Sequence, residues 1–117
     1  MKVGPKIAVS LLIKYAPSPL KEDVVNIALI LMDDHTTYVR ITNRWDRVRA
    51  LDPHADVDLL KATADDLLAQ LRDPHRREQC LQMMRSSFSN SLQLSDPVRC
   101  LLKNPKRDFA TLAAQLL

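Results

Sequence analysis

The densest basic group in the chain lies where an expected strand meets an expected short helix, and it consists of Arg40, Arg44, Arg47 and Arg49. Guanidinium groups hold several N–H donors in a fixed plane, so an arginine cluster can bind phosphates or carboxylates in bidentate fashion. Trp45 lies within the group, and tryptophan and arginine together are enriched at protein–protein contact surfaces. Two alternatives stay open: Trp45 anchors the short helix in the core, and Asp46, Asp52 and Asp56 neutralise the arginines locally.

A second set of candidates consists of amide side chains in or beside expected strands, namely Asn26, Asn90 and Gln93. Asn26 interrupts an otherwise apolar run, Val24–Met32. A buried amide must be hydrogen-bonded, because an unpaired one costs a few kcal/mol. Asn26 and Gln93 could satisfy each other across neighbouring strands, or they could line a pocket for a small ligand or a peptide.

The residue patterns typical of catalysis or of metal binding are absent from the sequence. His35, His54 and His75 are far apart and lack the spacing of metal ligands. No serine lies in a nucleophile elbow, and the single glycine, Gly4, excludes a glycine-rich phosphate loop. We therefore expect a protein that is not an enzyme and needs no metal or cofactor.

Length and charge restrict the remaining options. The 117 residues predict a single domain spanning 1–117. The net charge of +3 comes from basic residues spread almost evenly, whereas nucleic-acid binding more often shows a concentrated basic stripe. A nucleic-acid module using the arginines above with Lys103, Lys106 and Arg107 stays as the alternative. Without a secretion signal or membrane span, and with Cys80 and Cys100 expected to be reduced, we expect the cytoplasm.

The elements that must position these side chains are predicted from hydrophobic periodicity. Strict alternation of apolar and polar residues, apolar runs and proline or aspartate turns predict strands at 6–16, 24–32, 36–42 and 90–95. Helical spacing predicts a short helix from Trp45 to Leu51 and helices at 56–72, 74–86 and 105–117. The expected N-caps are Asp56 for the first of these three, Asp73 before Pro74 for the second, and Asn104 before Pro105 for the third.

These elements predict an α+β fold with two layers, in which a mainly antiparallel four-stranded sheet has helices packed on one face. The first strand should pair antiparallel with the second. We expect three leucines in the strands to be fully buried: Leu11, Leu29 and Leu92.

The chain also resembles a known bacterial family over nearly its whole length. The segments that carry the resemblance are Tyr15-Ala-Pro-Ser-Pro, Val25-Asn-Ile-Ala-Leu-Ile-Leu31, Arg47-Val-Arg-Ala-Leu, Ala55-Asp-Val-Asp-Leu-Leu60 and Phe88-Ser-Asn-Ser-Leu-Gln-Leu-Ser-Asp-Pro97. These segments are similar to the family catalogued as domain of unknown function 3037. Members of that family often accompany a HipA-like kinase, the type of protein found in toxin–antitoxin modules. The resemblance therefore implies a non-catalytic interaction or regulatory module that serves a protein partner, with that kinase as the candidate.

Overall fold

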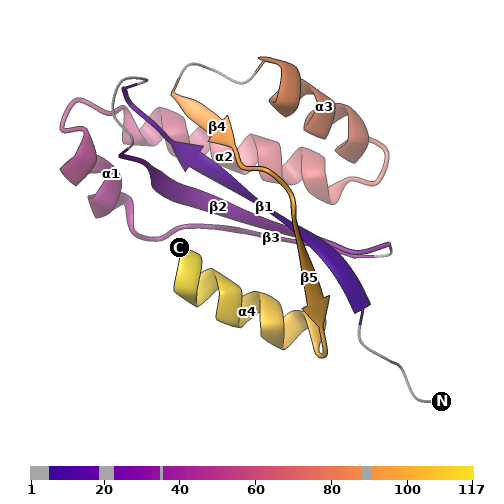
Figure 1. Cartoon of the computed structure of the whole chain (residues 1–117). Coiled ribbons are helices and arrows are strands. Elements are labelled where there is room, and N and C mark those ends of the chain that lie inside the picture. The colour runs from indigo at the N-terminus through magenta and orange to yellow at the C-terminus, as the bar shows by residue number, and fades with distance from the viewer. Residues whose placement is uncertain (1–5, 19–22, 35, 88–90) are drawn as a thin grey trace.

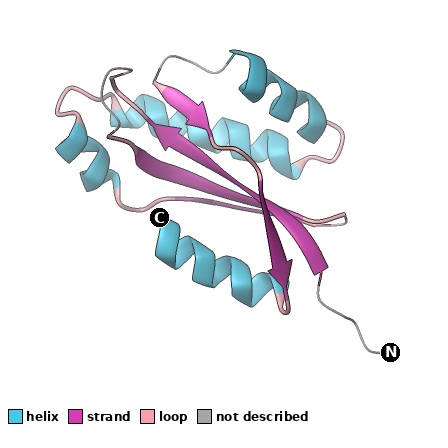
Figure 2. Ribbon diagram, in the orientation of Figure 1, coloured by secondary structure: helices cyan, strands magenta, loops and turns pink. Residues whose placement is uncertain are grey.

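The structure is a computed structural model, and it describes residues 6–18, 23–34, 36–87 and 91–117 (Figure 1). These residues form five strands and four helices, coloured by type in Figure 2. In chain order the elements are β1 (Lys6–Tyr15), β2 (Val25–Met32), β3 (Thr37–Ile41), α1 (Trp45–Leu51), α2 (Val57–Arg72), α3 (Arg77–Ser87), β4 (Leu92–Leu94), β5 (Val98–Leu102) and α4 (Pro105–Leu116).

The sheet is antiparallel throughout and is organised around β1. One edge of β1 pairs with β2, which continues to β3. The other edge pairs with two separate short strands, β4 at the C-terminal half of β1 and β5 at its N-terminal half. The α+β prediction and the β1–β2 pairing are confirmed. The number of strands is corrected from four to five, because Val98–Leu102 was not predicted as a strand.

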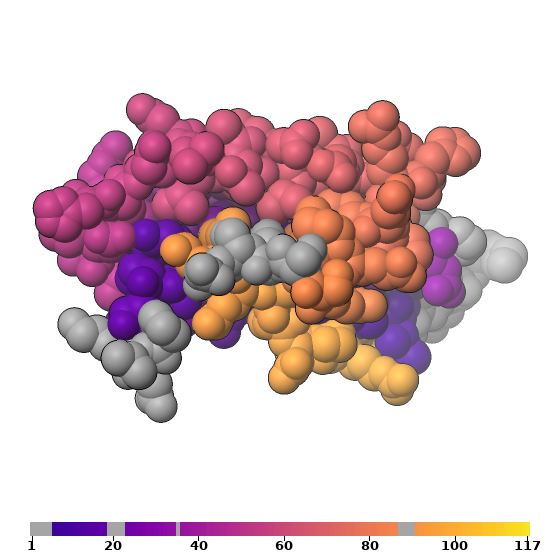
Figure 3. Space-filling view, turned by 90° about the horizontal axis from the view of Figure 1, so that it is seen from above, coloured from indigo at the N-terminus to yellow at the C-terminus, as the bar shows by residue number. Residues whose placement is uncertain are grey.

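Helices cover both faces of the sheet, not one (Figure 1). On one face, α1, α2 and α3 enclose the larger core, and Figure 3 shows α2 and α3 from that side. On the other face, α4 packs Phe109 and Ala113 against Leu29 and Leu31 of β2. The apolar alternation of β2 supplies both cores, since Ile30 faces the α2–α3 side. The fold therefore has three layers.

A β-bulge between β1 and β2 decides which way Asn26 faces. The register runs from Ile13 opposite Ala28 to Lys14 opposite Asn26, so Ile27 is an extra residue in β2. With strict alternation, Asn26 would share the face of Ala28 and enter the larger apolar core. The extra residue turns Asn26 towards α4 instead.

Capping side chains mark the starts of α2 and α4. The Asp56 side chain accepts a hydrogen bond from Leu59 N (3.0 Å), and Asn104 accepts one from Arg107 N (3.2 Å), ahead of Pro105. Both N-caps agree with the prediction. Asp73 instead ends α2 and accepts from His75 N within a turn, so α3 begins at Arg77 and not at position 74.

The three leucines expected to be buried are buried: Leu11, Leu29 and Leu92. Cys80 and Cys100 are both free thiols. Over the described ranges, no helix is long and apolar enough to span a membrane.

Candidate partner-binding site

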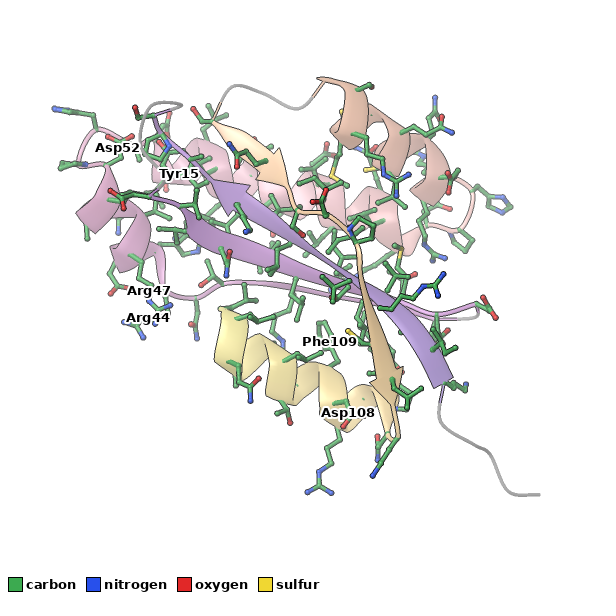
Figure 4. All side chains as sticks on the ribbon, in the orientation of Figure 1. Tyr15, Arg44, Arg47, Asp52, Asp108 and Phe109 are labelled. Atoms are coloured by element: carbon green, nitrogen blue, oxygen red, sulfur yellow. The ribbon has the colours of Figure 1, made fainter. Side chains whose placement is uncertain are left out.

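Three of the four arginines come together at one cleft of about 280 Å³ at the C-terminal end of α4. They are Arg40 from β3, Arg44 just before α1, and Arg47 within α1. Figure 4 shows Arg44 and Arg47 side by side below α1. The remaining wall consists of Ile41, Thr42, Asn43, Ala113, Ala114 and Leu117. The cleft, which we call the arginine cleft, therefore joins the β3–α1 turn to the end of α4.

Hydrogen bonds from the β3–α1 region hold the end of α4 in place. Thr42 is buried, and its Oγ1 accepts from Arg44 N (3.0 Å) and donates to the backbone oxygen of Leu117 (3.4 Å). Arg47 Nη1 donates to the same oxygen (3.4 Å). The Asn26 amide donates to the backbone oxygen of Leu116 (3.1 Å). Three side chains from β2, the turn and α1 thus bind the backbone oxygens of Leu116 and Leu117.

Of the three acids considered as neutralising partners, Asp46 pairs with an arginine of the cleft, whereas Asp52 and Asp56 have other partners. Arg44 forms an exposed ion pair with Asp46 (3.2 Å), and this hydrogen bond lowers the pKa of the Asp46 carboxyl below its usual value. Asp52 instead binds the Tyr15 hydroxyl, and Asp56 caps α2. Within the described part of the chain, Arg44 is the only member of the predicted arginine group with an ion pair. The charge of Arg47 also lowers the pKa of Asp46, so this one carboxylate acts on both Arg44 and Arg47.

Aromatic side chains hold Arg40 in its position at the arginine cleft. The Arg40 guanidinium lies over the ring of Phe109, 5.4 Å from its centroid, and Tyr38 stacks on Phe109 with ring centroids 5.5 Å apart. A cation over an aromatic ring is attracted by the electron-rich face. Because Phe109 is buried, this contact restricts the position of an otherwise exposed guanidinium.

The other two members of the predicted contact surface lie elsewhere. Trp45 is 8% exposed and belongs to the larger core, with Lys61 Nζ 5.7 Å from its ring centroid. Its position agrees with the alternative interpretation, a core anchor for α1. Arg49 is exposed on α1 but does not line the cleft.

The predicted amide pair does not form. Asn26 and Gln93 are both opposite Lys14, on the two edges of β1, so a whole strand separates them. Asn26 is hydrogen-bonded inside the fold, as expected, but to α4. Gln93 is exposed, and Asn90 lies outside the described residues.

Sequence reasoning missed a second polar contact, between Tyr15 at the end of β1 and Asp52 after α1. The Tyr15 hydroxyl donates to Asp52 Oδ2 (2.6 Å), and Asp52 Oδ1 accepts from His54 N (3.1 Å). Burial of the ring, then the hydrogen bond to Asp52 and its charge, raises the pKa of Tyr15 to about 12. The hydrogen bond from Tyr15 lowers the pKa of Asp52. No sequence pattern links these positions, because the pairing depends on how α1 packs against the sheet.

The Tyr15–Asp52 contact predicts a loss of stability at alkaline pH. Since the folded pKa of Tyr15 is raised from 10.0 to about 12, its contribution is complete below pH 10 and is lost as the pH rises from 10 to 12. We expect urea unfolding to show wild-type protein losing its advantage over Tyr15→Phe across that range. A difference between the two proteins that stays constant from pH 8 to 12 would contradict this assignment.

The Tyr15–Asp52 contact also predicts a loss of stability at acid pH. Because the folded pKa of Asp52 is lowered, its contribution is present above the usual carboxyl pKa and is lost as the pH falls through the folded value. The Tyr15→Phe variant should show a weaker version of this acid loss.

Comparison with known proteins agrees with the resemblance in the sequence. A family model described as "Protein of unknown function (DUF3037)" matches residues 11–117. Searches of curated proteins and of solved structures returned no match. The family match covers most of the chain, including every residue that lines the arginine cleft. The chain therefore belongs to the DUF3037 family.

Proposed function

We propose that this chain is a non-catalytic interaction module that binds an acidic segment of a protein partner in the arginine cleft. The observation that carries the proposal is the convergence of Arg40, Arg44 and Arg47 on one cleft, with only Arg44 in an ion pair among the described residues. Fixed guanidinium groups recognise carboxylates well, because two parallel N–H donors match the two carboxylate oxygens. Arginine is also enriched at interface hot spots.

The geometry favours a short acidic peptide over an extended polyanion. The other basic residues considered for nucleic-acid binding, Lys103, Lys106 and Arg107, lie around the start of α4. The arginine cleft lies at its other end, and a 12-residue helix is about 18 Å long. Figure 4 shows this separation between Asp108 in the first turn and the labelled arginines. Among the described residues, Arg44 and Arg47 are therefore separated from this second basic group by about the length of α4, whereas the Arg40 guanidinium lies over Phe109 in the first half of the helix.

The partner that we propose is a HipA-like kinase, the partner that the family resemblance implies. The chain would then act as its accessory or regulatory subunit in a bacterial operon of the toxin–antitoxin type. The family association supports the identity of the partner, and the arginine cleft supports the chemistry of the contact. These two parts of the proposal fail independently.

Replacing Arg47 with glutamate should weaken binding to the kinase encoded in the same operon by on the order of tenfold or more. The reversed charge would repel an acidic partner and would remove one hydrogen bond to Leu117. Arg49→Glu is the matched control, since Arg49 is an exposed arginine of the same helix that does not line the cleft. Isothermal titration with the purified kinase would measure both variants.

Each outcome of this experiment is informative. Equal binding by the two variants would show that the arginine cleft is not the contact surface. If the kinase does not bind wild-type protein but DNA or RNA does, with an affinity that falls steeply with salt, the nucleic-acid alternative replaces the proposal.

A further inference from the structure

The outer edge of β5 lacks a partner strand among the described residues. β5 pairs with residues 6–10 of β1 along one edge only. In an antiparallel strand, alternate residues direct their N–H and C=O groups away from the paired neighbour. These groups form a template for a further strand. In Figure 3, β5 lies at the margin of the molecule, and α3 does not cover it.

Exposed apolar side chains accompany this open edge. Ile7 and Leu101 are directly opposite each other in the β1–β5 register, and each is 67% exposed. Natural edge strands are usually protected by several charges, by a proline or by a bulge. β5 has one charged residue, Arg99, and an uninterrupted register with β1, and its one neighbouring proline, Pro97, precedes the paired residues. The edge is therefore suited to pairing.

We propose that the chain forms a homodimer in which β5 pairs antiparallel with β5 of a second copy. A two-fold axis uses the same edge on both copies and closes the assembly. Pairing of β5 with the opposite edge strand, β3, would be head-to-tail and would give a ring or an open filament instead of a closed dimer. The register that pairs all five residues of both strands places the axis at Cys100.

This register also gives a complementary arrangement of side chains. Arg99 lies opposite Leu101 of the second copy, so no like charges within the strand face each other. The hydrocarbon part of Arg99 can cover the exposed leucine while its guanidinium stays in water. Within each copy, Ile7 of β1 is opposite Leu101 and Val9 is opposite Arg99. One row of side chains across the four strands therefore consists of Ile7 and Leu101 of one copy, followed by Arg99 and Val9 of the second copy. Such a row joins the two sheets into one.

Cys100 provides a reporter of the register. Opposite residues of an antiparallel pair have Cα atoms about 4.5–5.5 Å apart, within the range that a disulfide can bridge. Mild oxidation of the wild-type protein should therefore give a covalent dimer of twice 13.3 kDa on non-reducing gels. Cys80→Ser should retain this product and Cys100→Ser should lose it, because Cys80 is buried in the core.

Sedimentation equilibrium of the full chain tests the dimer without oxidation. A contact made by one pair of five-residue strands predicts a weak dimer, with a dissociation constant in the micromolar range or above. Leu101→Lys should weaken the dimer by on the order of tenfold. The new lysine of each copy would lie opposite Arg99 of the other copy, so the two-fold axis produces this repulsion twice. Leu101→Lys combined with Arg99→Glu should restore the dimer, since the opposed charges then attract. Leu59→Lys, at a leucine of α2 that is 60% exposed, should leave the mass unchanged.

Two results would overturn the proposal. One is a monomeric mass for the wild-type protein at every concentration up to about 1 mM. The other is a dimer that Leu101→Lys does not weaken, because such a dimer uses another surface. Since Leu101 is exposed in the monomer, unchanged circular dichroism of the variant would exclude misfolding as the cause of dissociation.

Discussion

Replacing Leu29 with alanine is expected to lower the free energy of unfolding by about 2–5 kcal/mol. Leu29 is fully buried in the middle of β2, between Leu12 of β1 and Arg40 of β3, and it belongs to the core under α4. The substitution removes the burial of three carbon atoms and leaves a cavity that the surrounding strands cannot fill. Urea denaturation monitored by circular dichroism would measure the loss.

Leu59→Ala is the control for this experiment, because it makes the same chemical change at a leucine that is 60% exposed on α2. Its free energy of unfolding should stay within about 0.5 kcal/mol of wild type. A loss well under 1 kcal/mol for Leu29→Ala would show that the α4 face is not a packed core. Since small domains have only about 5–15 kcal/mol of stability in total, the expected loss is a large part of the whole.

Local periodicity explains why the first three strands and the helices could be predicted. β1 alternates over ten residues, and α2 has a continuous apolar stripe, so each pattern is complete within its own segment. β5 has no such pattern, because Leu101 is exposed and Leu102 is buried although both are leucine. Its pairing depends on the half of β1 that β4 leaves open, and this is a property of the tertiary structure.

The apolar residues on both faces of β2 already indicate a sheet with helices on both sides, although the predicted fold had helices on one face only. β2 is apolar on both faces, as expected for a strand covered by helices on both sides. Helix α4 has its own apolar stripe with Phe109, but its sequence does not say which face of the sheet it covers. The order of the elements is compatible with α4 on either face of the sheet. In the structure α4 covers the face that carries Leu29 and Leu31, and both leucines are buried there.

The arginine cleft could be predicted only in part. Arg40, Arg44 and Arg47 are close in sequence, so their grouping followed from the turn between β3 and α1. The wall formed by Leu117 could not be predicted, since it lies 70 residues beyond Arg47 and depends on the packing of α4. The sequence predicts that the Asn26 amide is hydrogen-bonded inside the fold. Its partner, the backbone oxygen of Leu116, could not be predicted, because the orientation of Asn26 depends on a one-residue bulge that periodicity does not show.

Asn26→Leu should lower the free energy of unfolding by about 1–3 kcal/mol and loosen the end of α4. Leucine has a similar volume but cannot donate a hydrogen bond, so the backbone oxygen of Leu116 would lose its Asn26 partner. The Thr42 and Arg47 bonds to Leu117, each 3.4 Å long, would then hold this end alone. Hydrogen exchange of the amides in the last turn of α4 should become faster, while exchange in β1 should follow the global stability only.

Gln93→Leu provides the matched comparison, because it makes an equivalent change at an exposed strand amide. We expect its stability within about 0.5 kcal/mol of wild type and no change in exchange at α4. If both variants lose the same stability, the two amides belong to one network and the assignment of Asn26 to Leu116 is wrong. If Asn26→Leu alone is destabilised and the last turn of α4 exchanges faster, the amide in β2 acts by holding the wall of the arginine cleft. Its effect on partner binding would then be indirect, and Asn26→Leu should weaken binding less than Arg47→Glu does.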